Sequence, residues 1–313
     1  MKLLLPDALP LAPSVPDDVR TVVYDASSPV PDDHLDATAL VTWGSTRQDL
    51  AAVAGRMPDL RWVQTLAAGP DDVLAAGFAS DVVLTCGTGL HSRTVAEHAL
   101  TLVLGLVRRM PRMRRAQAEH RWASELGGLQ PLRPDGAVTT LLGARVLIWG
   151  LGSIGGALAP LLRQLGADVR GVARSAGERG GVPVVAEADL DEELAGTDVL
   201  VMILPTTRAT DRALDARRLA ALPPGAYVVN VGRGSTVDEE ALVDALRAGR
   251  LAGAALDVAA TEPLPAGSPL WDAPGLVLTP HAAGGRPVGA DELIAHNLRA
   301  LRAGENLRNV VPR

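Results

Sequence analysis

Short runs of consecutive apolar residues alternate with longer amphipathic segments along the chain. The first runs are "KLLL", "TVVYD", "ALVTW", "WVQTL" and "VVLTC", within residues 2–86. A second series contains "ARVLIWG", "DVRGVA", "DVLVMIL", "AYVVNV", "GAALDV" and "LVLTP", within 144–280. Because strands that are buried on both faces appear as continuous apolar runs, the pattern predicts an α/β fold with parallel, doubly wound sheets.

The segment between the two series, "SRTVAEHALTLVLGLVRRMPRMRRAQAEH", predicts a long helix that begins near Ser92. Its first half is apolar and its second half is rich in arginine, and Pro111 is expected to kink the helix or to end it. Thr236 and Glu239 have the spacing of a capping box, which predicts a helix start at that point. A last helix is predicted over roughly 288–303.

Length and charge narrow the class of protein. The 313 residues are more than one hydrophobic core usually serves, so two domains are expected. The net charge is −6, and the basic residues, almost all arginine, are scattered singly or in pairs. A nucleic-acid-binding protein needs a clustered basic face, so no nucleic-acid partner is expected.

Cysteine usage and hydropathy predict the compartment. Cys86 is the single cysteine, so no intrachain disulfide can form and a reducing compartment is expected. Pro6 and Asp7 end the apolar start of the chain too early for a signal peptide. The apolar run "ALTLVLGLV" (99–107) is too short to span a bilayer. We therefore expect a soluble, cytoplasmic protein with no membrane partner.

A glycine-rich turn stands between an apolar strand and an amphipathic helix in "VLIWGLGSIGGALAPLLRQLG". In this G-x-G-x-x-G pattern Gly150 would allow the tight turn, Gly152 would let the backbone approach a pyrophosphate, and Gly155 would let helix and strand pack closely. The pattern alone is weak, but its flanks are those of a βαβ unit. The stretch therefore predicts a dinucleotide site at a helix N-terminus.

The end of the next strand, "RGVARS", indicates which dinucleotide binds. An acidic residue here would accept hydrogen bonds from the adenosine ribose and repel a 2′-phosphate. Ala173 stands there instead, followed by Arg174 and Ser175, whose guanidinium and hydroxyl suit a phosphate. NADP(H) is therefore favoured. The alternative is that Arg174 stacks on adenine or is solvated, while NAD(H) binds without a ribose carboxylate.

Three ionisable residues follow late strands, at the sheet edge where α/β proteins bind ligands. Arg233 lies in "VVNVGRGS", Glu262 in "ALDVAATEPLP" and His281 in "LVLTPHAAGG". Taken singly, each is as easily a solvated or structural side chain. Together they supply an anion clamp, a proton-transferring imidazole and a carboxylate that favours the imidazolium. His91, His98 and His120 lack companions at metal-ligand spacing, so no metal site is expected.

With these motifs in this order, the chain resembles the D-isomer-specific 2-hydroxyacid dehydrogenase family. The matching stretches are "WVQTLAAGPDDV", "TVAEHAL", "GLGSIG", "LPTTRATDRAL", "VVNVGRGSTVDEEAL", "LDVAATEPLP" and "LTPHAAGG". The resemblance implies a Rossmann dinucleotide-binding domain over 93–284, inserted into a flavodoxin-like substrate domain formed by 1–92 and 285–313. It also implies an active site in the cleft and a homodimer with the helix from Ser92 at its interface.

The resemblance also assigns roles by position. Arg233 would bind the carboxylate and carbonyl oxygen of the substrate, His281 would be the acid/base, and Glu262 would hold His281. The main-chain amides of Ala68 and Gly69 would receive the substrate carboxylate. The implied cofactor contacts are Ser153 and Ile154 at the pyrophosphate, Leu204 and Pro205 at the adenosine, Val231 along the cofactor, and Asp257 at the nicotinamide carboxamide.

Some positions depart from the family pattern or keep two interpretations. Ala259 stands where a phenylalanine is common, and "HAAGGRP" follows the histidine in a less typical way, which leaves the pocket wall open. Trp43 either lines the substrate pocket or packs in the core. Arg286 is either an anchor for a distal anionic group of the substrate or a solvated loop residue.

The function expected from the residues and the resemblance is an NADP(H)-preferring D-2-hydroxyacid dehydrogenase, with NAD(H) possible. It would act mainly as a reductase of small 2-oxoacids such as glyoxylate and hydroxypyruvate. A phosphoglycerate dehydrogenase-like enzyme is the alternative within enzymes, disfavoured because no C-terminal regulatory domain is seen. Formate dehydrogenase is disfavoured because its hydride transfer needs no acid/base. A dinucleotide-sensing regulator on the same fold is disfavoured by the intact Arg, Glu and His.

Overall fold

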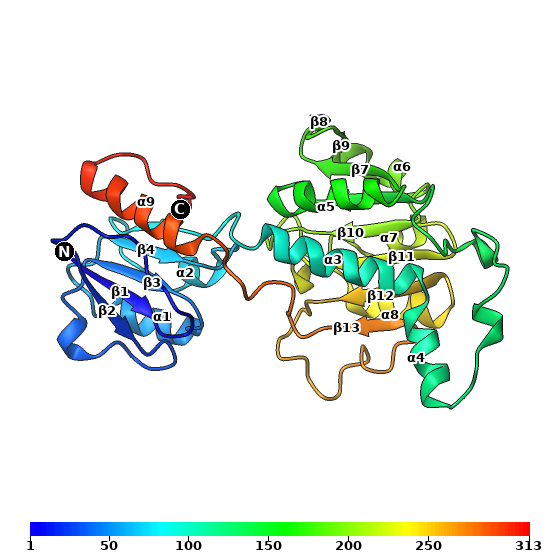
Figure 1. Ribbon diagram of the computed structural model, residues 1–313, viewed down its shortest axis with the longest axis horizontal. Coiled ribbons are helices and arrows are strands. Elements are labelled where there is room, and N and C mark those ends of the chain that lie inside the picture. Colours follow the sequence, from blue (N-terminus) through cyan, green and yellow to red (C-terminus); the bar gives the residue numbers. More distant parts are fainter. The chain divides into compact units, whose positions relative to one another are not determined.

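The computed structural model describes residues 1–313 and divides the chain into two compact units (Figure 1). Unit 1 comprises 1–91 and 285–313, and unit 2 comprises 92–284. None of the helices combines the length and the hydrophobicity that a membrane span requires.

Unit 1 is built on a five-stranded sheet in which every pair of neighbours is parallel. The strands are β1 (Lys2–Pro6), β2 (Arg20–Tyr24), β3 (Ala39–Thr42), β4 (Trp62–Thr65) and β5 (Val83–Thr85). Their spatial order is β2-β1-β3-β4-β5. This is the flavodoxin-like order, so the expected fold class of this unit is confirmed.

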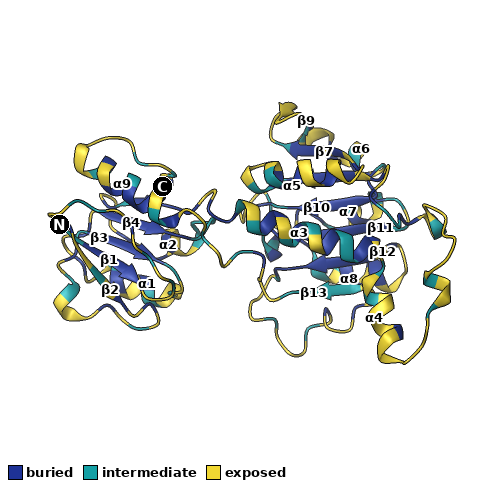
Figure 2. Cartoon of the chain, in the orientation of Figure 1, coloured by how far each residue is buried: buried dark blue, intermediate teal, exposed yellow.

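Helices cover both faces of this sheet, and each face has its own core (Figure 2). The helices are α1 (Arg47–Ala54), α2 (Asp71–Ala75) and α9 (Ala290–Ala303). Apolar residues of α1 and α2 pack with Leu4, Leu40 and Val63 on one face. Residues of α9 pack with Leu3 and Trp62 on the other. Successive strand residues thus point to opposite faces, which is why the inner strands β1 and β3 are buried along nearly their whole length.

A buried chain of polar side chains connects α9 to the sheet of unit 1. Trp62 Nε1 donates to Thr85 Oγ1 at 2.8 Å, and Thr85 Oγ1 donates to Gln64 Oε1 at 2.8 Å. Asn297 Nδ2 donates to the same Gln64 oxygen at 2.8 Å, and Asn297 Oδ1 accepts from the Arg308 amide at 2.8 Å. Because all four side chains are fully buried, each of these bonds satisfies a group that water cannot reach.

Unit 2 contains an eight-stranded sheet in the order β13-β12-β11-β10-β6-β7-β9-β8. Its strands are β6 (Arg145–Trp149), β7 (Asp168–Ala173), β8 (Gly177–Arg179), β9 (Val182–Ala186), β10 (Val199–Met202), β11 (Ala226–Asn230), β12 (Leu251–Leu256) and β13 (Leu276–Leu278). All pairs are parallel except β8 with β9. The run β9-β7-β6-β10-β11-β12 is the Rossmann strand order, which confirms the expected fold class.

Four longer helices and two shorter ones surround this sheet or extend from it. They are α3 (Ser92–Val107), α4 (Met110–Ala118), α5 (Ser153–Gln164), α6 (Leu190–Leu194), α7 (Ala216–Ala221) and α8 (Glu239–Arg247), with 3₁₀ turns at Ser124–Leu126, Pro134–Gly136, Glu187–Asp189 and Gly234–Thr236; unit 1 has one at Asp32–His34. Helices α3 and α5 pack side by side on one face (Figure 1). Residues of α6, α7 and α8 form the core on the other face.

Two predicted helix features are wrong in detail. The break in the long helix occurs at Arg109, which has a left-handed φ of 55°, and Pro111 lies in the first turn of α4 instead of ending a helix. Proline fits there because first-turn amides have no helical acceptor. Helix α8 is capped by Asp238, whose side chain accepts from the Ala241 amide, and not by Thr236. The Thr236 hydroxyl donates instead to the Arg233 carbonyl at 2.6 Å.

The buried polar chain predicts a large effect of one substitution in α9. We expect Asn297→Leu to lower the free energy of unfolding of unit 1 by about 2–4 kcal/mol, because it leaves the Arg308 amide without its acceptor. The matched control is Arg299→Leu at an exposed position of the same helix, expected to change stability by less than about 1 kcal/mol. Urea unfolding followed by circular dichroism measures both. Equal stabilities of the two variants would contradict the role given to Asn297.

Candidate active site

The glycine-rich turn joins β6 to α5, and two of its glycines are required by close contacts within the protein. Gly150 has a φ of +106°, and a Cβ there would lie 2.5 Å from the carbonyl oxygen of Ile203. Gly155 lies in α5, where a Cβ would lie 2.9 Å from the Gly150 oxygen. Helix and turn therefore approach each other more closely than any side chain would allow.

The second glycine of the turn faces open space. A Cβ on Gly152 would meet no atom within 4 Å, so nothing in the protein itself requires a glycine there. Gly152 is the N-cap of α5 and no side chain caps the helix, which leaves the first-turn amides, including those of Ser153 and Ile154, without acceptors. Free amides, a positive helix end and open space beside a glycine fit the pyrophosphate of a dinucleotide.

The other predicted cofactor residues lie at the carboxyl ends of neighbouring strands. Arg174 and Ser175 follow β7 and are exposed, and Arg174 has no ion-pair partner. Buried Leu204 and exposed Pro205 follow β10, and buried Val231 follows β11. All of these positions are on the edge of the sheet that also carries the glycine turn, because the strands concerned are parallel.

Arg233 stands in a tightly built loop after β11. The fully buried Asn230 donates to the Arg233 carbonyl at 3.0 Å and accepts from the Gly232 amide at 3.0 Å. A Cβ on Gly234 would lie 1.9 Å from the carbonyl carbon of Ala259, so the loop packs directly on the main chain that follows β12. Arg233 Nη1 donates to the Gly232 carbonyl at 2.9 Å. The guanidinium is thus carried by a rigid support beside the Glu262 loop.

His281 and Glu262 are joined by a hydrogen bond across two loops. Nδ1 of His281 donates to Oε2 of Glu262 at 2.7 Å, and Oε1 of Glu262 accepts from the Ala259 amide at 2.9 Å. Both carboxylate oxygens are therefore engaged, which fixes the carboxylate and through it the imidazole ring. With Nδ1 engaged, Nε2 of His281 remains available for proton transfer to a bound molecule.

Asp257 holds the main chain around His281. Its buried carboxylate accepts from the Thr279 hydroxyl at 2.5 Å, the Ala282 amide at 2.8 Å and the Ala283 amide at 3.0 Å. His98 Nε2 also lies 3.2 Å from Asp257 Oδ1. The Asp257 carbonyl accepts from the His281 amide at 2.8 Å. Asp257 therefore supports the main chain of the His281 segment.

Neither Thr279 nor the role of His98 was found by sequence reasoning. His98 Nε2 and Thr279 Oγ1 lie 3.1 Å apart, although 181 positions separate them in the chain. No local motif connects such distant positions. From the sequence, His98 was considered only as a metal ligand, and its half-buried place beside Asp257 indicates a structural role.

Unit 1 has its own ligand-sized cavity at the carboxyl ends of β3 and β4. Its volume is about 370 Å³, and its lining includes Trp43, Thr65, Gly69 and Asp72. The amides of Ala68 and Gly69 donate to no acceptor in the protein, although both residues are half-buried. Two adjacent free donors of this kind suit an anionic oxygen.

Trp43 lines this cavity and also packs against a neighbouring ring. It stacks on His91, with ring centroids 5.3 Å apart and planes 18° from parallel. His91 Nε2 donates to the Leu66 carbonyl at 2.8 Å. Burial lowers the pKa of His91, although the bond to Leu66 acts in the opposite direction, so His91 is a neutral partner for the indole. Arg286 is an exposed loop residue.

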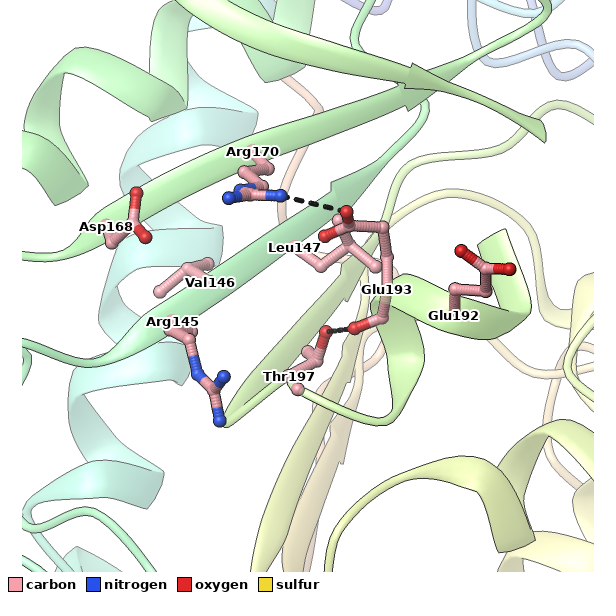
Figure 3. Close-up of a pocket in the computed structure, with 9 residues that line it drawn as sticks. Arg145, Val146, Leu147, Asp168, Arg170, Glu192, Glu193 and Thr197 are labelled. Atoms are coloured by element: carbon pink, nitrogen blue, oxygen red, sulfur yellow. Dashed lines mark hydrogen bonds and ion pairs between the residues drawn. The ribbon is translucent and has the colours of Figure 1, made fainter. Parts of the chain in front are cut away.

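Another cavity, of about 340 Å³, lies at the opposite end of the unit 2 strands (Figure 3). Arg145 and Asp168 begin β6 and β7 there, and Arg170 pairs with Glu193 at 2.8 Å. The sheet edge with the glycine turn and His281 is at the carboxyl ends of the strands. This cavity therefore plays no part in the candidate active site.

Comparisons with known proteins agree with this geometry. Residues 100–283 match the model of the D-isomer specific 2-hydroxyacid dehydrogenase, NAD binding domain. The chain is similar to glyoxylate/hydroxypyruvate reductase A of Serratia proteamaculans, with 35% identity over 90% of this chain and 88% of that protein. It is 32% identical to D-3-phosphoglycerate dehydrogenase of Mycobacterium tuberculosis, over 88% of this chain and 51% of that protein.

A solved structure is similar over nearly the whole chain. It is a D-isomer specific 2-hydroxyacid dehydrogenase from Xanthobacter autotrophicus in complex with NADPH and MES. The identity is 35%, the TM-score is 0.80, and the match covers 95% of this chain and 90% of that chain.

The hydrogen bonds of Asp257 predict that this carboxylate is needed for the site to form. We expect Asp257→Asn to lower the free energy of unfolding of unit 2 by about 2–3 kcal/mol, because an amide nitrogen would face main-chain donors. Hydrogen exchange at Ala282 and Ala283 should become faster at the same time. The exposed Asp189→Asn serves as the control. Unchanged exchange at both amides would contradict the supporting role of Asp257.

Proposed function

Because the chain belongs to the D-isomer-specific 2-hydroxyacid dehydrogenase family, we propose that it reduces small 2-oxoacids to D-2-hydroxyacids with NADPH. The observation that carries this proposal is the Glu262–His281 pair, which leaves Nε2 of the imidazole available, while the loop of Glu262 packs on the loop of Arg233. The proposal favours glyoxylate and hydroxypyruvate as substrates, and the Serratia relative named for this activity supports it. An intact acid/base pair counts against a purely dinucleotide-sensing regulator.

The preference for NADP(H) rests on the end of β7. A carboxylate there would repel a 2′-phosphate, and this chain has Ala173, Arg174 and Ser175 instead. The Xanthobacter structure, which holds NADPH, supports the same choice. Arg174 and Ser175 would bind the 2′-phosphate, and the amides of Ser153 and Ile154 would bind the pyrophosphate.

The proposed mechanism assigns one task to each side chain. A reduced nicotinamide, when bound, supplies a hydride for the carbonyl carbon of the substrate. Arg233 binds the substrate carboxylate and polarises the carbonyl. His281, protonated, gives the proton on Nε2 to the carbonyl oxygen as negative charge develops there, and Glu262 stabilises the imidazolium before the transfer. In the reverse direction neutral His281 removes the hydroxyl proton.

The cavity of unit 1 indicates the class of substrate tail. Its lining includes a single charged side chain, that of Asp72, and no cation. Asp72 already pairs with Arg47 at 3.1 Å, so the lining offers a phosphate no unpaired cation. The hydroxymethyl tail of hydroxypyruvate suits Thr65 and the face of Trp43. We propose that the free amides of Ala68 and Gly69 receive the substrate carboxylate. The phosphoglycerate dehydrogenase alternative is therefore disfavoured.

We further propose a cytoplasmic homodimer. Large apolar side chains are exposed in and after α4, with Trp122 at 92% and Leu129 at 103% exposure and Met110, Met113 and Leu132 also exposed. A second copy of the chain would cover such a surface. Sedimentation that returns only a monomer would exclude this assembly. The single, buried Cys86 fits a reducing compartment.

A substrate panel tests the proposed function. We expect kcat/KM for hydroxypyruvate and glyoxylate with NADPH to exceed the values with NADH by about tenfold or more. The reason is that the two cofactors differ by one phosphate, which the protein would bind through an ion pair. The value for 3-phosphohydroxypyruvate should be lower than that for hydroxypyruvate. Oxidation of D-glycerate but not L-glycerate checks the handedness. A higher kcat/KM for the phosphorylated substrate would overturn the substrate class.

Variants of the acid/base pair test the mechanism. We expect His281→Asn to lower kcat by about 10²–10⁴-fold with little change in the dissociation constant for NADPH, since proton transfer is lost and cofactor contacts stay. Arg233→Ala should cost about 3 kcal/mol or more of transition-state stabilisation in kcat/KM. Arg286→Ala, at an exposed loop position, is the control. Full kcat in His281→Asn would remove the imidazole from the mechanism.

A further inference from the structure

We propose that Arg179 is a specificity-determining residue that binds the 2′-phosphate of NADP(H) together with Arg174. This inference rests on the NADP(H) preference proposed above. It assigns a role to the edge hairpin β8–β9, whose outer strand β8 lies outside the Rossmann strand order and outside the acid/base pair.

The hairpin is fixed to the domain at its turn. Gly180 and Gly181 join the two strands with φ values of +59° and +76°, the left-handed pair that a tight two-residue turn requires. Arg163, from α5, donates through Nη1 to the Gly181 carbonyl at 2.8 Å. The hairpin is thus tied to the helix that begins at the glycine-rich turn.

The register of the hairpin directs Arg179 to the α5 side of the sheet. Arg179 is the cross-strand partner of Val182, and directly paired residues point to the same face. Val182 is buried in the core that α5 and Leu151 share. Arg170 on β7 points to the opposite face of the sheet, toward α6, where it pairs with Glu193 (Figure 3).

The guanidinium of Arg179 reaches the glycine-rich turn itself. Its Nη1 donates to the Leu151 carbonyl, between the first two glycines, at 3.3 Å. A dinucleotide places its adenosine ribose between this turn and the end of the second strand, where exposed Arg174 stands. The two guanidiniums therefore approach the ribose 2′ position from the turn and from the strand end.

Neither guanidinium is neutralised by a carboxylate of the protein, whereas Arg170 is. Arg179 uses one donor on Leu151, and its remaining donors are available for phosphate oxygens. A phosphate held by two arginines gains two charge-assisted contacts, and 2′-hydroxyl cofactors gain neither.

Binding of two small ligands tests this role without catalysis. Adenosine 2′,5′-bisphosphate and 5′-AMP differ only in the 2′-phosphate, and isothermal titration calorimetry at low salt gives both dissociation constants. We expect Arg179→Gln to weaken the bisphosphate by about tenfold or more and 5′-AMP by less than about twofold. Glutamine is shorter than arginine and uncharged, so the variant removes the charge together with the bond from Nη1 to the Leu151 carbonyl. Arg170→Gln, which removes the same charge from the other face, is the matched control, expected to change neither constant.

The outcomes separate this inference from the proposal on which it rests. If the unaltered protein binds the two ligands equally, the NADP(H) preference itself is wrong. If it prefers the bisphosphate and Arg179→Gln keeps the full preference, only the role of Arg179 is overturned. Equal weakening of both ligands would mean that Arg179 only shapes the turn. Arg179→Lys should restore part of the preference, since it restores the charge.

Discussion

Close contact between main chains at the carboxyl ends of the unit 2 strands determines where every candidate functional group stands. Gly150 meets the Ile203 carbonyl, Gly232 would place a Cβ 2.6 Å from the Leu204 amide, and Gly234 meets Ala259. At each contact a methyl group would force two loops apart. Since these loops also carry Arg233, Glu262 and the cofactor-facing amides, any widening would separate groups that must act on one molecule.

The His281 segment shows how the protein stabilises an unfavourable local conformation. His281 has a φ of 53°, in the left-handed region that costs a residue with a Cβ about 1–2 kcal/mol. The carboxylate and carbonyl of Asp257 both accept hydrogen bonds from this segment and hold it in place. Because the strained main chain at His281 is held by the buried Asp257, the imidazole needs little rearrangement when a substrate arrives. Preorganised acid/base catalysis requires such a fixed group.

The sequence was informative where contacts are local or repeat along the chain. All of the strands predicted from continuous apolar runs exist. Gly150 allows the tight turn and Gly155 the close packing, as expected. The hairpin β8–β9 was missed, because β8 is three exposed residues and Pro183 interrupts the apolar run of β9. Prolines are poor indicators of strands, and exposed strands lack apolar periodicity.

The remaining errors and omissions have a shared physical cause. The helix break at Arg109 depends on how the chain turns after α3, and the Thr236 hydroxyl is used by a carbonyl inside its own loop. The contacts of Asp257 with His98 and of Arg179 with Leu151 join positions far apart in sequence. Such pairs are chosen by tertiary packing, and one sequence without its fold contains no trace of them.

The hairpin also affects how the molecule behaves in a crowded solution. An open sheet exposes unpaired main-chain donors and acceptors at its two outermost strands, and long, flat edges of this kind recruit strands from other chains. The sheet of unit 2 ends in β8 on one side and β13 on the other, each three residues long. In β8 those residues include Glu178 and Arg179. The β8 edge is thus too short and too charged to serve as a template for aggregation.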